Sequence, residues 1–193
     1  MDNTAGSLSQ IQRSVIIGSL LGDGYLRIVP GRRNAFLEVN HSFKQKDYVD
    51  WKYSILKDIT VSAPRKRVID KVRTAYRFYT KQHPEITELF KEFYKDGVKI
   101  IPKDLKISTL SLAVWLMDDG SKCRKIDVYL NTQQFSHRDQ LTLINVLNEL
   151  NLSARLNKDK TYTRIRFMKK SLLELKRLIS PHIIPSMKYK IEI

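Results

Sequence analysis

The sequence predicts an α+β fold built from two similar halves, each running helix, hairpin, helix, hairpin, helix. Three observations support this prediction. Two apolar, helix-like runs, residues 14–24 and 111–120, end in Gly-Asp-Gly and Asp-Asp-Gly respectively. Each run precedes the same succession of strand and helix signals, which indicates an internal duplication. Each half also contains one strongly basic hairpin, over residues 65–81 and 155–170.

The two apolar runs are expected to be buried helices, because they are apolar all round and not along one face only. In each run, a glycine ends the helix where a residue with a β-carbon would be strained. We expect the two helices to pack against each other on a pseudo-twofold axis. The halves are then residues 1–99 and 109–193, joined by a linker over residues 100–108.

The remaining elements follow from local signals. Runs of β-branched and aromatic residues around turn residues predict hairpins, and apolar residues at helical spacing predict helices. In the first half these elements are a hairpin of residues 25–29 and 36–43, a helix of 47–59, the basic hairpin and a helix of 84–94. In the second half they are a hairpin of residues 121–126 and 127–135, a helix of 136–150, the basic hairpin and a helix of 171–179.

Two of these elements carry more detail. Ser136 with Asp139 resembles a capping box at the start of the helix over residues 136–150. The apolar face of this helix is expected to hold Leu141, Ile144, Leu147 and Leu150. In the last strand of the second half, Ile165 and Phe167 alternate with Arg164 and Arg166, so one strand face packs on a core and the other presents cations.

The charge balance points to a polyanionic partner. The 193 residues include 35 Lys plus Arg against 20 Asp plus Glu, a net charge of +15. Nucleic acid is the polyanion that such an excess fits best, while a generally basic surface is the simpler alternative. A single cysteine excludes an intramolecular disulfide framework. We expect no membrane association and no secretory signal, since residues 1–13 lack a basic region followed by an apolar block.

Asp23 and Asp119 are the strongest candidates for chemistry, because each closes an apolar helix at an equivalent place. Two unpaired carboxylates brought near one axis would repel each other, and a divalent cation relieves that repulsion. Oxygen ligands of this kind suit Mg²⁺. Phosphodiester hydrolysis uses such a site to activate water and to stabilise the leaving oxygen.

The two runs resemble the paired motifs of LAGLIDADG homing endonucleases: Ile16-Ile-Gly-Ser-Leu-Leu-Gly-Asp-Gly24 and Leu112-Ala-Val-Trp-Leu-Met-Asp-Asp-Gly120. Three segments are most similar to the single-chain type encoded in mitochondrial introns: Trp115-Leu-Met-Asp-Asp-Gly120, Leu130-Asn-Thr-Gln133 and Ile184-Pro-Ser-Met-Lys-Tyr-Lys190. The resemblance extends from about Val15 to Ile191.

This resemblance implies a monomeric, sequence-specific endonuclease that hydrolyses both strands of a long, asymmetric double-stranded DNA site. A four-stranded antiparallel sheet in each half would form a saddle over the duplex. The metal ligands would be Asp23 and Asp119, together with the preceding residues Gly22 and Asp118. Mg²⁺ is the expected ion, with Mn²⁺ substituting for it and Ca²⁺ binding without cleavage.

Further catalytic residues follow from the same resemblance. Gln133 would order water or metal, and aligning Phe43 with Phe135 gives His41 the same place in the first half. Histidine in place of an amide makes the two halves chemically unequal. The family's catalytic lysines correspond to Lys99 and Lys190, for which an ordinary basic surface is the alternative reading.

DNA contacts are expected from the exposed sheet faces, which would read bases in the major groove while other basic residues bind phosphates. The expected DNA-binding residues are Arg27, Arg32, Arg33, Lys44, Arg65, Lys66, Arg67, Arg73, Arg77, Lys122, Arg124, Arg155, Asn157, Lys158, Arg164 and Arg166.

Two other functions fit the same scaffold. An intron RNA maturase would use the basic faces without cleaving DNA, although aspartates in both motifs favour cleavage. A DNA-binding regulator is the other alternative, and an additional DNA-binding domain would distinguish it. The family resemblance places the protein inside the cell, in a mitochondrion or another organelle.

Overall fold

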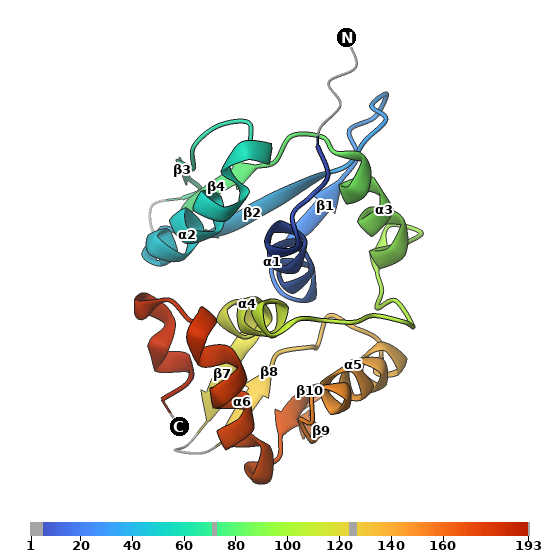
Figure 1. The fold of residues 1–193 in the computed structure, drawn as a ribbon, viewed down its shortest axis with the longest axis vertical. Coiled ribbons are helices and arrows are strands. Elements are labelled where there is room, and N and C mark those ends of the chain that lie inside the picture. Colours follow the sequence, from blue (N-terminus) through green and yellow to red (C-terminus); the bar gives the residue numbers. More distant parts are fainter. Residues whose placement is uncertain (1–5, 71–72, 124–126, 193) are drawn as a thin grey trace. The chain divides into compact units, whose positions relative to one another are not determined.

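The structure, a computed structural model, describes residues 6–70, 73–123 and 127–192. It confirms the α+β class. The chain forms two compact units, Met1–Lys91 (unit 1) and Glu92–Ile193 (unit 2). Each unit has the predicted order of helix, hairpin, helix, hairpin and helix (Figure 1). The division into halves at residues 99 and 109 remains a prediction.

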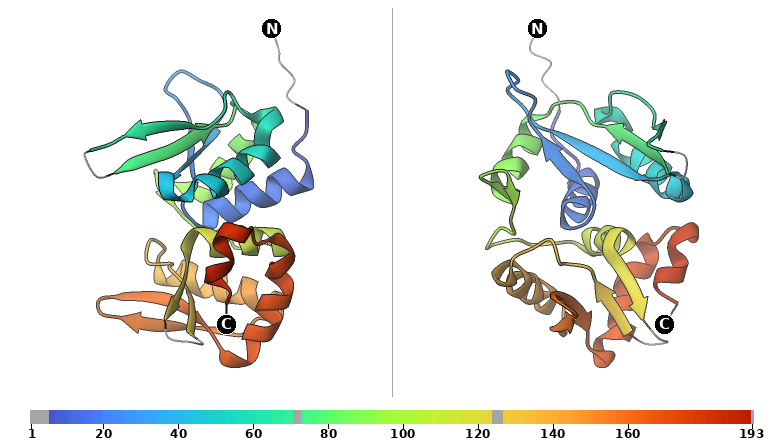
Figure 2. Two further views of the ribbon diagram at one scale, coloured as in Figure 1. Left: turned by 90° about the vertical axis from the view of Figure 1, so that its left-hand side faces the viewer. Right: turned by 180° about the vertical axis from the view of Figure 1, so that it is seen from behind.

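Unit 1 contains one four-stranded antiparallel sheet in the order β1-β2-β4-β3. Helix α2 packs against β2 and β4, and α1 contacts α2 and β1. Figure 2 shows both helices on one side of this sheet. The elements are α1 (Gln10–Leu21), β1 (Tyr25–Arg27), β2 (Phe36–Ser42), η1 (Phe43–Gln45), α2 (Lys46–Leu56), η2 (Lys57–Ile59), β3 (Arg65–Val68), β4 (Thr74–Tyr79) and α3 (Pro84–Phe93), which crosses into unit 2.

Unit 2 repeats the arrangement with a sheet in the order β7-β8-β10-β9. Helix α5 packs against β9 and β10, and α4 contacts α6, β7 and β8. The elements are β5 (Tyr94–Lys95), β6 (Val98–Lys99), α4 (Thr109–Asp119), β7 (Gly120–Cys123), β8 (Asp127–Leu130), α5 (His137–Glu149), β9 (Ala154–Asp159), β10 (Tyr162–Phe167), η3 (Lys169–Ser171), α6 (Leu172–Ile179), η4 (Ser180–His182) and η5 (Pro185–Lys190).

The glycines after α1 and α4 are required by close approach and not by a left-handed backbone. Gly24 N donates a hydrogen bond to Ser19 O at 2.7 Å, and a Cβ on Gly24 would lie 2.7 Å from that oxygen. A Cβ on Gly120 would lie 2.3 Å from Leu116 O. The predicted strain at the helix ends is therefore a steric clash between a side chain and the last helical turn.

The helix N-termini differ partly from the sequence prediction. At α5, the Ser136 hydroxyl accepts the Asp139 N–H at 3.1 Å and donates to the Asp139 carboxylate at 2.7 Å. Ser136 is therefore the N-cap, but the reciprocal contact of a capping box is replaced by a contact between side chains. A complete capping box is found at α1, between Ser9 and Gln12, where the sequence analysis did not predict one.

Two further features were not predicted. A tight hairpin of β5 and β6 precedes α4, and its turn residues Asp96 and Gly97 have φ of 51° and 76°. Positive φ at both central residues fits the mirror-image turns that join tight hairpins.

In α5 the buried residues are Gln140, Leu143, Val146 and Leu147, whereas Leu141 is 46% exposed. The predicted apolar face of this helix was therefore rotated from the true one.

The two faces of each sheet differ in chemistry. On β2, Leu37 and Val39 point to the helices, while Glu38 and Asn40 point to the opposite side, which we call the open face. Strand pairing extends each face across the sheet, because directly paired residues lie on the same side. Among the described residues, no helix is long and apolar enough to span a bilayer.

Candidate active site and nucleic-acid interface

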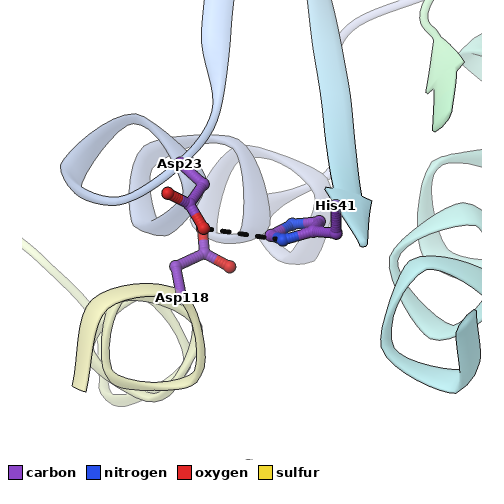
Figure 3. Close-up of side chains that lie close together, drawn as sticks. All are labelled: Asp23, His41 and Asp118. Atoms are coloured by element: carbon purple, nitrogen blue, oxygen red, sulfur yellow. Dashed lines mark ion pairs between the residues drawn. The ribbon is translucent and has the colours of Figure 1, made fainter. Parts of the chain in front are cut away.

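Asp23 follows α1 and lies beside His41 of β2 (Figure 3). The Oδ2 atom of Asp23 is 3.5 Å from Nδ1 of His41. Half of the Asp23 side chain is exposed, whereas that of His41 is only 3% exposed. The His41 ring is tilted against Tyr48 of α2, with centroids 5.3 Å apart. The buried imidazole therefore holds one carboxylate oxygen while the carboxylate stays accessible to solvent.

The pairing of β2 with β4 explains why the His41 side chain lies next to Asp23. His41 lies on the helix side of β2, directly opposite Tyr76 of β4. The Tyr76 hydroxyl donates to Asp50 of α2 at 3.0 Å. Burial, and then this hydrogen bond, raise the pKa of Tyr76 above its ordinary value. The phenol facing His41 is therefore neutral at physiological pH and adds no charge to the site.

Two hollows border Asp23. One, of about 680 Å³, runs along η1 and the β3–β4 hairpin and includes Lys44 and Arg73 in its lining. The other, of about 370 Å³, lies over β1 and β2 and includes Arg27. Asn40 lines both. An anionic ligand next to Asp23 would thus have cationic side chains on either side of it.

The Asp23 site fits a divalent cation. Two ligand atoms about 2.1 Å from one octahedral Mg²⁺ lie about 3 Å apart, close to the 3.5 Å between the Asp23 oxygen and the His41 nitrogen. Carboxylate oxygen is the hard donor that Mg²⁺ prefers, and imidazole is accepted more readily by Mn²⁺. Gly22, which precedes Asp23, is buried at the C-cap of α1 and offers only its backbone.

The end of α4 carries the second candidate aspartate. Asp119 is the last residue of this helix, is half-buried, and its Oδ2 accepts a hydrogen bond from Gln134 Nε2 at 3.5 Å. Its backbone oxygen accepts the N–H of Asn131 at 3.0 Å. Gln134, which the sequence analysis did not select, therefore reaches Asp119, and Gln133 lies exposed in the same loop. Asp118, also drawn in Figure 3, is buried in the last turn of α4.

Lys190 is bound to the end of the same helix. Its ammonium donates hydrogen bonds to the backbone oxygens of Leu116 (3.5 Å), Met117 (2.5 Å) and Asp118 (3.0 Å). The last four carbonyls of a helix lack partners within it, and a cation there is favoured by the helix dipole. Lys190 therefore caps α4. Lys99 is half-buried at the end of β6, opposite Tyr94.

The open faces of the two sheets carry many of the predicted DNA-binding residues. In unit 1 these residues are Arg27, Arg65, Arg67 and Arg77, and in unit 2 they are Arg155, Asn157, Arg164 and Arg166. Arg32 and Arg33 lie exposed in the β1–β2 loop, Lys44 lies in η1, and Arg73 pairs with Asp70 at 2.8 Å beside β4. Arg124 lies outside the described residues.

Three predicted residues point to the helix side of their sheets instead. Lys66 lies 3.8 Å above the Phe43 ring, and Lys122 donates a hydrogen bond to Glu192 O. Lys158 pairs in register with Thr163, on the side of the buried Ile165. In each case the alternation of side chains along the strand decides the face. These lysines can reach phosphates only at the sheet edges, and they do not belong to the open face.

The open face of unit 2 also holds residues that the sequence analysis did not select. Arg166 Nη2 is 2.5 Å from Asp127 Oδ1, and Arg164 Nη2 is 3.1 Å from Asp159 Oδ2. The guanidinium carbons lie over the Tyr129 ring, that of Arg164 at 4.1 Å and that of Arg166 at 5.9 Å from its centroid. Counting charges along the sequence cannot reveal these pairs, because they depend on strand register.

Comparison with known proteins gives the family. Residues 13–175 match the LAGLIDADG DNA endonuclease family. The chain is 32% identical over 201 residues to the probable intron-encoded endonuclease 1 of Wickerhamomyces canadensis, covering 96% of this chain and 85% of that protein. It is 30% identical over 210 residues to the cytochrome b mRNA maturase bI2 of Saccharomyces cerevisiae, covering 99% of this chain but only 49% of the yeast protein.

A solved structure has the same fold. It is the homing endonuclease I-WcaI bound to its DNA recognition sequence, with a TM-score of 0.89 and 29% identity. The match covers 97% of this chain and 88% of that one. Together with the family match over residues 13–175, this likeness shows that the chain belongs to the LAGLIDADG DNA endonuclease family.

Proposed function

We propose that this protein is a sequence-specific DNA endonuclease that hydrolyses both strands of a double-stranded site with Mg²⁺. The observation that carries the proposal is the repeated placement of an aspartate at the end of an apolar helix. Asp23 lies beside His41 in unit 1, and Asp119 lies beside Gln134 in unit 2. The homing endonuclease I-WcaI, which has the same fold, is bound to its DNA recognition sequence in its structure.

The roles of the residues follow from their surroundings. Asp23 and Asp119 would hold the metal through their carboxylates, with the His41 nitrogen as a further ligand beside Asp23. Gln134 would fix how the Asp119 carboxylate points. When bound, Mg²⁺ lowers the pKa of its water and stabilises the leaving oxygen of the phosphodiester. The open faces of the two sheets would bind the duplex.

The net charge of +15 supports the nucleic-acid partner. Each phosphate contact releases a condensed counterion, so binding should weaken steeply as salt rises. We expect the protein to act as a monomer, because its duplicated halves supply both aspartates. A location in a mitochondrion or another organelle stays a prediction from the family.

The test is selection from a randomised duplex library in the presence of Mg²⁺. The wild type should cut one sequence, while Asp23→Asn and Asp119→Asn should bind that sequence without cutting it. With Ca²⁺ in place of Mg²⁺, binding should persist and cleavage should stop. The nuclease proposal fails if the wild type cuts no sequence, or if the asparagine variants cut as well as the wild type.

An intron RNA maturase is the second candidate. The observation that favours it is the 30% identity to the cytochrome b mRNA maturase bI2 of Saccharomyces cerevisiae, across 99% of this chain. A splicing assay with candidate intron RNA distinguishes the two functions. If the protein is a maturase, the wild type and the variants Asp23→Asn and Asp119→Asn should accelerate splicing equally. Assistance with splicing requires no metal-bound carboxylate in the protein.

A further inference from the structure

The open face of unit 2 contains a carboxylate where a surface that binds DNA would be expected to carry only cations. Asp127 begins β8, and 10% of its side chain is exposed. Burial of an ionised carboxylate is costly unless it is paired. Its partner is Arg166 on the neighbouring strand β10, at 2.5 Å from Nη2. Because Asp127 is so little exposed, releasing Arg166 would leave a buried charge, and the pair is therefore held closed.

Tyr129 limits Arg166 from a second direction. The two residues are directly paired between β8 and β10, and the guanidinium carbon lies 5.9 Å from the ring centroid. Tyr129 is only 6% exposed, so neighbouring atoms enclose it. A cation close to a tyrosine ring face is attracted by the quadrupole of the ring. A guanidinium fixed by both an anion and a ring has few other positions available.

Arg164 provides a contrast on the same strand. It pairs with Asp159 at 3.1 Å, but 43% of the Asp159 side chain is exposed. A pair with one solvated partner contributes little to stability and opens easily. The Tyr129 ring lies 4.1 Å from the Arg164 guanidinium carbon, so both arginines contact the ring, and the two ion pairs differ in the exposure of the acid. Arg164 can therefore exchange the solvated Asp159 for a phosphate or a base, whereas Arg166 keeps the buried Asp127.

Unit 1 has the same combination on its open face. Glu38 lies on β2 with 15% of its side chain exposed, and its carboxylate is 3.5 Å from Arg27 and 4.0 Å from Arg77. The Arg77 guanidinium carbon also lies 5.4 Å from the centroid of the Tyr79 ring. In both sheets, therefore, an inner strand carries a largely buried acid. This acid contacts an arginine, and the same arginine lies over a tyrosine ring.

We propose that Asp127 and Glu38 are specificity-determining positioning residues, which hold Arg166 and Arg77 as rigid readers of guanine. This inference rests on the proposed DNA-binding function. A guanidinium has five N–H donors, so the bond through Nη2 leaves donors for the O6 and N7 of guanine. A carboxylate on this face also repels phosphates. The acids therefore weaken binding to any duplex while sharpening the choice of base.

The test compares base preference with general affinity. Asp127→Asn, Arg166→Ala and the wild type are each selected against a randomised duplex library, and their binding to an unselected duplex is measured separately. Asp104→Asn is the matched charge control, since Asp104 is an exposed acid of unit 2 outside the sheet. Thermal unfolding of each variant shows that it is folded.

Asp127→Asn and Arg166→Ala should lose the same guanine, each by about tenfold or more in discrimination. Their binding to unselected duplex should change in opposite directions, severalfold tighter for Asp127→Asn and weaker for Arg166→Ala. Asp104→Asn should keep the guanine preference. A purely structural role of Asp127 would weaken both kinds of binding and lower the thermal midpoint, and this result would overturn the inference.

Two other outcomes are informative. If Asp127→Asn keeps the wild-type base preferences, the inference is wrong while the proposed endonuclease function stands. If the wild type selects no sequence, the proposed function fails and the inference fails with it. If Asp127→Asn does not fold, Glu38→Gln makes the same test in unit 1. It should lose guanine preference at a different base pair, and an unchanged selection there refutes the inference.

Discussion

Replacing Lys190 by methionine tests whether this residue acts as a helix cap. The four last carbonyls of α4 have identified partners. Gly120 N donates to Leu116 O, Asn131 N donates to Asp119 O, and Lys190 serves the carbonyls of Met117 and Asp118 and lies 3.5 Å from that of Leu116. Hydrogen bonds to a charged group contribute ~1.5–3 kcal/mol, and a cation at a helix C-terminus contributes ~0.3–1 kcal/mol. One shared ammonium should therefore stabilise the fold by about 2–3 kcal/mol.

Urea unfolding followed by tryptophan fluorescence measures this loss, because Trp115 is fully buried within α4. Lys190→Met should lower the unfolding free energy by about 2–3 kcal/mol, and Lys190→Arg by less than ~1 kcal/mol, since arginine keeps the charge and the donors. Lys188→Met is the matched control, because Lys188 is exposed in the same η5 segment. It should leave the unfolding free energy unchanged.

The refuting result is equally specific. If Lys190→Met unfolds within ~0.5 kcal/mol of the wild type, a range expected of ordinary surface substitutions, Lys190 is not a structural cap. If the same variant then fails to cut DNA, Lys190 acts on the reaction itself, as the family resemblance implied. Lys99→Met serves as the comparison for both measurements, the unfolding free energy and DNA cleavage. Lys99 lies in the β5–β6 hairpin and not at the end of α4, so its replacement removes no cap of that helix.

Three further predictions concern stability. Gly120→Ala places a Cβ 2.3 Å from a backbone oxygen and should cost at least ~1–3 kcal/mol in urea unfolding, whereas Gly6→Ala, with nothing within 4 Å, should be neutral. Gln140→Leu removes bonds to Thr163 and leaves buried polar groups unsatisfied, so we expect a loss of ~2 kcal/mol, and an unchanged urea midpoint would contradict this. Burial lowers the pKa of His182 below 6.5, so protonation favours the unfolded state. Stability should therefore fall as pH drops through 6.5 towards the lowered pKa, and His182→Gln should reduce this dependence in urea titrations at several pH values.

Much of the fold could be predicted because its signals are local. The apolar runs before Asp23 and Asp119, the turn residues between strands and the alternation of Ile165 and Phe167 with arginines all depend on neighbours in the chain. These patterns gave the element order in both halves, with differences of a few residues at most boundaries. The exception was β8, which ends at Leu130, so residues 131–135 form the loop that brings Gln134 to Asp119.

The site was less predictable, because its partners come from different elements. Gln134 and Gln133 are adjacent and chemically identical, and only the conformation of the loop after β8 selects Gln134. Lys190 looked like a catalytic lysine in the motif, yet its ammonium reaches the end of a helix more than 70 residues earlier in the chain. Lys66 and Lys158 counted as basic residues of their hairpins, although strand pairing places them on the helix side of their sheets.

The duplication and the α+β class could be predicted from the linear chain, since periodicity and repeated motifs are properties of the sequence. The roles of Asp23 and Asp119 stay predictions. Which charges are paired depends on the folded structure. Asp127 and Glu38 gave no signal in the sequence, because an acid among many bases has no distinctive spacing. Register between neighbouring strands placed Asp127 against Arg166 and Glu38 against Arg77. Electrostatic interactions act through space, so their partners become defined only when the strands have paired.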